Sequence, residues 1–205
     1  GRLIATANHV IGEAKEVFVR TVTGEVFSAE IVLREPQTDV ALLRIARQLK
    51  PIEHAQSTSI GRRACAVGNG FGLGVSVTCG VVSATRMSGV GFNRVEDFVQ
   101  TDTSVNPGMS GGALVDKDGR LIGMLSAIFT KKSAADIGVN FAVQTALLKR
   151  IVDEFSETGA LAAVYKQLNQ NVTVGVGYNF TTFSDDLADL TFDDEGAFLN
   201  IVAAF

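Results

Sequence analysis

The chain has 205 residues, of which 46% are hydrophobic and 20% charged, and its net charge is −4. This length suits one medium-sized domain, or one domain with a tail, and the apolar content is sufficient for a buried core. Because the net charge is slightly negative, we expect no nucleic-acid partner. Glycine is frequent, at 21 residues, and proline is scarce, at 3, which is typical of a β-rich protein with tight turns.

The first half of the chain alternates apolar and polar residues in short segments. An apolar-leaning segment leads into His9, and residues 16–22 and 26–35 alternate on either side of a Thr-Gly-Glu turn, which predicts a β-hairpin. Another strand is predicted over 39–46. The polar segment 46–63 then connects the two halves of the chain.

The second half continues the strand pattern and ends in a helix. Strands and hairpins are predicted over residues 64–68, 75–86, 94–102, 112–129 and 138–144. Residues 145–155 have apolar side chains at helical spacing. Many short strands followed by one helix predict a mainly β fold of two barrels with a closing helix.

The charge distribution separates a C-terminal tail from this body. Residues 161–205 contain one base and six acids, a net charge of −5, which leaves +1 on residues 1–160. We therefore expect a domain over residues 1–156 and a tail over 157–205. The acidic loop of the tail lacks the spacing and glycine of an EF-hand, so no metal site is predicted there.

The stretch Gly-Met-Ser-Gly-Gly, residues 108–112, precedes the predicted hairpin. One interpretation is a glycine-rich turn, in which serine is common. The other is a nucleophile, whose flanking glycines allow a substrate carbonyl to approach backbone N–H groups. A serine nucleophile requires a base, and the base requires an acceptor that fixes its tautomer.

Two histidines could supply the base, and one aspartate stands out as the acceptor. His54 lies in the polar connector and is expected to be solvated, whereas His9 ends a strand beside a turn and can face a cleft. Asp39 begins an apolar strand, so its carboxylate is expected to be partly buried and to need a partner. The order His9, Asp39, Ser110 is that of the chymotrypsin-type triad.

Three segments resemble the His, Asp and Ser motifs of the HtrA/Deg family of trypsin-like serine proteases. They are TANHVIGEA, TDVALLRI and TDTSVNPGMSGGALVDKDGRLIGM. The resemblance covers residues 1–156. It implies a trypsin-like fold of two six-stranded β-barrels with a C-terminal helix. Since the chain starts only eight residues before His9, the first barrel is expected to be N-terminally truncated.

The resemblance also assigns roles in a catalytic site. It implies that Ser110 is the nucleophile, that His9 is the general base and then acid, and that Asp39 orients His9. The backbone N–H groups of Gly108 and Ser110, with Met109 between them, would form the oxyanion hole. No metal ion or organic cofactor is required.

The specificity pocket and the biological setting follow from the same resemblance. Ala127, Ile128 and Phe129 would line the primary specificity pocket, which favours small or medium apolar side chains in unfolded segments. The implied function is cleavage of unfolded proteins or peptides in protein quality control. The implied location is the bacterial cell envelope, in the periplasm, and the implied assembly is a homo-oligomer.

The tail and the cysteines raise separate questions. The tail resembles the closing strands of bacterial outer-membrane β-barrel proteins, with two predicted strands in a hairpin-like arrangement over 172–181 and 197–205, which suggests outer-membrane association. Cys65 and Cys79 are equidistant from Gly72, so a symmetric hairpin would bring them face to face. A disulfide and two buried free thiols are both compatible with this placement.

Two other functions remain open at this level. In the first, the shortened barrel misplaces His9, and the chain is a catalytically impaired module that binds extended peptides. In the second, the chain is an outer-membrane-associated fragment whose working part is the tail. Covalent labelling of Ser110 distinguishes the protease from the binding module, and partition into detergent or membranes identifies the fragment.

Overall fold

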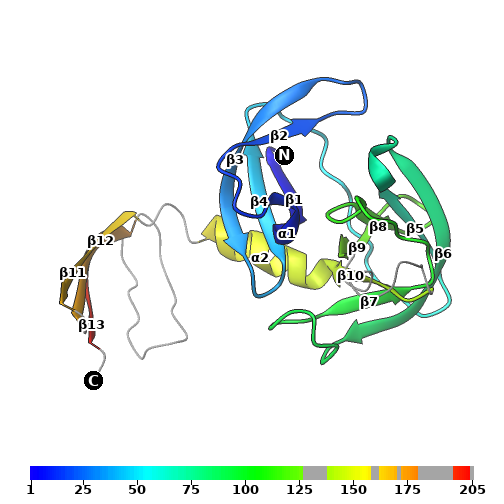
Figure 1. The fold of residues 1–205 in the computed structure, drawn as a ribbon. Coiled ribbons are helices and arrows are strands. Elements are labelled where there is room, and N and C mark those ends of the chain that lie inside the picture. The colour runs from blue at the N-terminus through cyan, green and yellow to red at the C-terminus, as the bar shows by residue number, and fades with distance from the viewer. Residues whose placement is uncertain (127–137, 158–161, 170–171, 180–195, 204–205) are drawn as a thin grey trace. The chain divides into compact units, whose positions relative to one another are not determined.

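The computed structural model describes residues 1–126, 138–157, 162–169, 172–179 and 196–203 (Figure 1). The chain divides into two compact units, Gly1–Lys149 and Arg150–Phe205. The first unit contains a four-stranded sheet and a closed barrel, and the second contains a three-stranded sheet. Mainly β architecture is therefore confirmed.

The four-stranded sheet comes from the first quarter of the chain. Its order is β1-β4-β3-β2, and every pairing is antiparallel. The strands are β1 (Leu3–Ala7), β2 (Val17–Arg20), β3 (Val26–Glu35) and β4 (Val40–Ile45). The predicted hairpin is the β2–β3 pair. The expected shortened first barrel is thus an open sheet in the described residues, with β4 buried in its centre.

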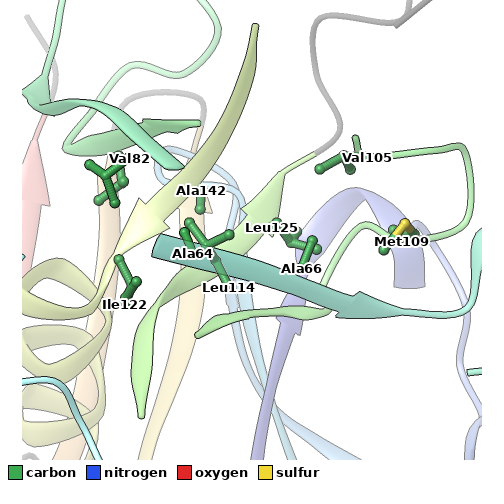
Figure 2. Close-up of a cluster of buried hydrophobic side chains, with 10 residues drawn as sticks. Ala64, Ala66, Val82, Val105, Met109, Leu114, Ile122, Leu125 and Ala142 are labelled. Carbon is green, nitrogen blue, oxygen red and sulfur yellow. The ribbon is translucent and has the colours of Figure 1, made fainter. Parts of the chain in front are cut away.

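The closed barrel follows and has the order β10-β7-β6-β5-β8-β9. Its strands are β5 (Arg63–Gly68), β6 (Ser76–Met87), β7 (Phe98–Thr101), β8 (Ala113–Val115), β9 (Leu121–Ser126) and β10 (Asn140–Gln144). Figure 2 shows its core, in which the small residues Ala64 and Ala66 of β5 lie among larger side chains such as Leu114 and Leu125, as a narrow barrel requires. The buried cluster is Ala64, Ala66, Val82, Val99, Val105, Met109, Leu114, Ile122, Leu125 and Ala142.

One predicted strand is shorter than its pattern suggests. The prediction covers residues 94–102, yet β7 begins only at Phe98. The preceding residues use their hydrogen-bonding groups outside the barrel: the N–H of Val95 donates to the carbonyl of Gln37, at 2.9 Å. A contact with a distant segment therefore takes the place of strand pairing before Phe98.

The two cysteines form a disulfide. Cys65 and Cys79 are directly opposite each other on β5 and β6, and their sulfur atoms are bonded. The alternative of two free thiols is thereby removed. The bond joins the two strands that carry the glycine-rich loop between them, which contains the short helix η1 (Gly70–Gly72).

The helix α2 (Thr145–Glu157) agrees with the predicted helix and buries Leu147, Leu148 and Ile151.

The second unit contains the antiparallel strands β11 (Ala162–Asn169), β12 (Val172–Asn179) and β13 (Gly196–Ala203). The two strands predicted in the tail correspond to β12 and β13, and β11 is a third strand that the sequence pattern did not predict. Its sequence AAVYKQLN is rich in residues that are infrequent in strands, so the pattern was missed.

Candidate active site

His9 and Asp39 are brought together by the pairing of β1 with β4. Ala7, the last residue of β1, lies opposite Val40, the first residue of β4. His9 follows in a four-residue helix, α1 (Asn8–Ile11), and the N–H of Asn8 donates to the carbonyl of Asp39 at 3.0 Å. The sequence predicted a turn beside His9, and the structure makes that turn a single helical turn.

The side chains of His9 and Asp39 are in direct contact. His9 Nδ1 lies 2.7 Å from Asp39 Oδ2, and the backbone N–H of His9 donates to Asp39 Oδ1 at 2.9 Å. Because an ionised carboxylate only accepts hydrogen bonds, this contact places the imidazole proton on Nδ1. The second ring nitrogen, Nε2, is then available as a proton acceptor.

The environment of Asp39 favours its charged form. The residue is only 7% exposed, and this burial by itself would raise the pKa of the carboxyl group. The hydrogen bonds and charge of His9 act in the opposite direction, as does the hydroxyl of Ser126, which donates to Asp39 Oδ2 at 3.3 Å. These interactions hold the pKa of Asp39 below its ordinary value of 3.8.

The turn before Ser110 has the sequence required for a type II turn. The N–H of Met109 donates to the carbonyl of Asn106 at 3.0 Å, Pro107 occupies the second position, and Gly108 has φ +96° in the third. The N–H of Phe71 donates to the Pro107 carbonyl at 2.7 Å. Since the peptide is planar and trans, the N–H of Gly108 points away from Phe71.

The two glycines after Ser110 are required by close contacts. A Cβ atom on Gly111 would lie 2.4 Å from Thr6 Oγ1 and 3.0 Å from the nitrogen of Ala7. A Cβ atom on Gly112 would lie 2.4 Å from the carbonyl oxygen of Val67. The serine segment therefore passes between β5 and the end of β1, immediately before the helix that carries His9.

Met109 makes a larger contribution than the sequence suggested. Its side chain is 1% exposed and belongs to the barrel core (Figure 2). A Cβ atom on Gly68 would lie 3.0 Å from Met109 Cβ, and one on Gly70 would lie 3.6 Å from Met109 Cγ. The glycine-rich loop therefore leaves the space that Met109 fills beneath it.

The remaining predicted residues are distributed as follows. His54 is exposed and forms a parallel bridge with Leu121, as expected of a solvated connector. The predicted specificity residues Ala127, Ile128 and Phe129 lie outside the described residues. The sequence placed Ser126 only at the start of the turn expected to line the specificity pocket, residues 126–129, and gave no signal of its contact with Asp39.

The described residues form neither a metal site nor a membrane-spanning helix. Among the described residues, no group of three or more His, Cys, Asp or Glu side chains is placed to hold a metal ion. Within the same residues, no helix has both the length and the apolar character needed to cross a membrane.

The fold and this site define a trypsin-like peptidase, and the chain belongs to the trypsin-like peptidase domain family, which matches residues 1–124. It is 38% identical over 160 residues to the periplasmic serine endoprotease DegP of Salmonella typhimurium, covering 76% of this chain and 34% of that protein. It is 36% identical over 162 residues to the periplasmic pH-dependent serine endoprotease DegQ of Escherichia coli, covering 77% and 35%. The chain thus spans about a third of the length of these relatives.

The chain is also similar to solved structures of serine proteases. The HtrA-type protease AlgW with a tripeptide is 37% identical and superposes with a TM-score of 0.73, covering 82% of this chain and 58% of that chain. A serine endoprotease from Yersinia pestis is 34% identical with a TM-score of 0.66, covering 79% and 57%.

Proposed function

We propose that this chain is a serine endopeptidase in which Ser110, His9 and Asp39 form the catalytic triad. His9 Nε2 accepts the hydroxyl proton of Ser110 as its oxygen attacks the substrate carbonyl. The imidazolium then donates that proton to the leaving amine, which gives an acyl-enzyme on Ser110. Water, deprotonated by His9, attacks the acyl group, and the proton returns to Ser110 with release of the acid product.

The observation that carries this proposal is the 2.7 Å contact between His9 Nδ1 and Asp39 Oδ2. A buried carboxylate on one nitrogen leaves the opposite nitrogen basic and stabilises the imidazolium that forms during the reaction. The second support is the turn at Gly108, whose N–H would join that of Ser110 as donors to the oxyanion. Loss of one such donor costs about 3–4 kcal/mol of transition-state stabilisation in a comparable enzyme.

The substrates that we infer are unfolded proteins and peptides. The relatives are named periplasmic serine endoproteases, and the similar AlgW structures contain a tripeptide or a decapeptide. We infer the same periplasmic location and a role in protein quality control. The specificity for small or medium apolar side chains stays a prediction, because it depends on Ala127, Ile128 and Phe129.

Cleavage of an unfolded substrate tests this function. Casein should be degraded by the wild-type chain and by Ser57→Ala, which changes an exposed serine of the connector. Ser110→Ala should leave the melting temperature within a few degrees of the wild type and abolish cleavage. Unchanged cleavage by a folded Ser110→Ala chain would remove the assignment, and peptide binding without cleavage in the wild type would favour the binding module.

The tail carries a second, separate proposal. The three described strands of the tail pair antiparallel, as neighbouring strands do in outer-membrane barrels. We infer that the tail associates with the outer membrane, and flotation with lipid vesicles should then carry the chain into the lipid fraction. Recovery of all protein in the aqueous fraction would contradict this association.

The homo-oligomer also stays a prediction, and light scattering can measure the oligomeric state of the chain.

A further inference from the structure

The segment between β6 and β7 folds around a single carboxylate. Glu96 Oε2 accepts the N–H of Val90 at 2.7 Å, and Glu96 Oε1 accepts the N–H groups of Phe92 and Asn93 at 2.7 and 3.0 Å. Hydrogen bonds to an ionised acceptor are strong, and a carboxylate can accept several at once. The shape of residues 90–93 therefore depends on Glu96.

This segment is also fixed to the barrel by aromatic packing. The ring of Phe92 lies edge-on to Phe98, with centroids 6.5 Å apart, and to Phe141, with centroids 5.7 Å apart. Both partners belong to barrel strands, β7 and β10. The Glu96 carboxylate and the Phe92 ring together hold Asn93 in a fixed position on the barrel.

Two hydrogen bonds join this segment to the turn between β3 and β4 of the four-stranded sheet. Asn93 Nδ2 donates to the carbonyl of Thr38 at 3.0 Å, and the N–H of Val95 donates to the carbonyl of Gln37 at 2.9 Å. Gln37 and Thr38 lie in the middle of the turn between β3 and β4, residues 36–39. The next residue along the chain is Asp39.

Asp39 is held in a conformation that its own backbone does not favour. Its φ is +60°, in the left-handed region that non-glycine residues seldom adopt. Such a conformation persists only when the surroundings over-determine it. The carbonyl of Thr38 is part of the peptide that precedes Asp39, so a donor fixed on the barrel restrains the peptide plane on which the Asp39 carboxylate depends.

We propose that Asn93, itself held by Glu96, is a positioning residue that sets the Asp39–His9 contact from the opposite sheet. The proposal rests on the proposed function, because the Asp39–His9 contact orients His9, the proposed base of the reaction. Asn93 takes no part in the chemistry, and its effect passes through the Thr38 carbonyl.

The test uses the wild-type chain and Asn93→Asp, which keeps the size of the side chain and replaces the amide donor with an oxygen that repels the Thr38 carbonyl. Proton NMR at low temperature follows the Nδ1-bound proton of His9, which reports directly on the contact with Asp39. We expect this resonance to move or broaden in Asn93→Asp. We also expect kcat to fall about tenfold or more, with KM changed less than twofold.

Two controls separate positioning from general destabilisation. Arg94→Ala removes an exposed neighbour in the same segment and should leave the resonance unchanged. Val99→Ala creates a cavity in the barrel core and should lower the melting temperature without moving the resonance. If Asn93→Asp does not fold, Asn93→Ala removes the same donor and carries the same expectation.

An unchanged His9 resonance in a folded Asn93 variant overturns the proposal, and so does an equal change in Val99→Ala. If the wild-type chain fails to cleave casein, the proposed function is wrong, while the resonance still decides whether Asn93 sets the His9–Asp39 contact.

Discussion

The main-chain N–H of Phe71 donates a 2.7 Å hydrogen bond to the carbonyl oxygen of Pro107. The bond joins the glycine-rich loop between β5 and β6 to the turn that precedes Ser110. It orients the Pro107–Gly108 peptide, and therefore the Gly108 N–H that we assign to the oxyanion hole. The disulfide between Cys65 and Cys79 joins the two strands that carry this loop.

Gly108→Ala should reduce kcat by about 100-fold or more, since it displaces an oxyanion donor. The new Cβ would lie 2.7 Å from the carbonyl oxygen of Asn69 and 3.2 Å from the nitrogen of Phe71, at a residue with φ +96°. Gly119→Ala is the matched control, because Gly119 has φ +77° but open space around it. Steady-state cleavage of a chromogenic peptide measures both, and equal losses of kcat in the two variants would contradict the assignment of Gly108.

Reduction of the disulfide should destabilise the chain. The bond closes a loop with a sequence separation of 14 residues, for which the chain-entropy account gives about 3 kcal/mol. The double variant Cys65→Ser, Cys79→Ser should therefore unfold at lower urea concentration than the oxidised wild type. Dithiothreitol should lower the stability of the wild type and leave that of the double variant unchanged. A wild-type midpoint that dithiothreitol does not alter would refute this.

Met109→Ala should cost about 2–5 kcal/mol of unfolding free energy, as large-to-small changes in packed cores do. The side chain is 1% exposed and fills the space left by Gly68, on which a Cβ would lie 3.0 Å from Met109 Cβ. Met109→Leu conserves volume and should cost less than about 1.5 kcal/mol. Urea denaturation compares the two variants, and similar small losses would mean that the packing beneath the loop contributes little.

The stabilising effect of Asp39 should depend on pH in a defined direction. Its pKa is lowered in the folded chain from the ordinary value of 3.8, so the folded state favours the carboxylate. Its contribution is complete above about pH 5 and is lost as the pH falls through 3.8 and then through the lower folded-state pKa. We expect wild type to exceed Asp39→Asn by about 1–3 kcal/mol of unfolding free energy at pH 7.

Chemical denaturation at several pH values measures this difference. The gap between wild type and Asp39→Asn should narrow below about pH 4. A gap that widens on acidification would show that burial, rather than the hydrogen bonds from His9 and Ser126, dominates the environment of Asp39.

The local pattern predicted most strands, the helix α2 and the burial of Asp39. These features follow from alternation or periodicity over a few residues, and Asp39 directly precedes the buried run of β4. The same reasoning could place His9 and Ser110 in order along the chain. It could not measure their separation, which depends on the pairing of β1 with β4 and on the passage of Gly111 beside Thr6.

The features that were missed depend on contacts between distant segments. Ser126 reaches Asp39 across 87 residues, and Asn93 reaches Thr38 across 55. Neither residue lies in a pattern that distinguishes it from an ordinary polar side chain. The sequence gives no sign that the Met109 side chain is buried, because the space beneath the glycine-rich loop exists only once β5 and β6 have paired.

Labelling with a fluorophosphonate probe, with the adduct located by mass spectrometry, shows directly whether Ser110 is an activated nucleophile. We expect a single adduct on Ser110 of the wild-type chain, and its loss in both Ser110→Ala and His9→Ala. Absence of an adduct on Ser110, in a chain that circular dichroism shows to be folded, would contradict the assignment of these residues as a working nucleophile and base.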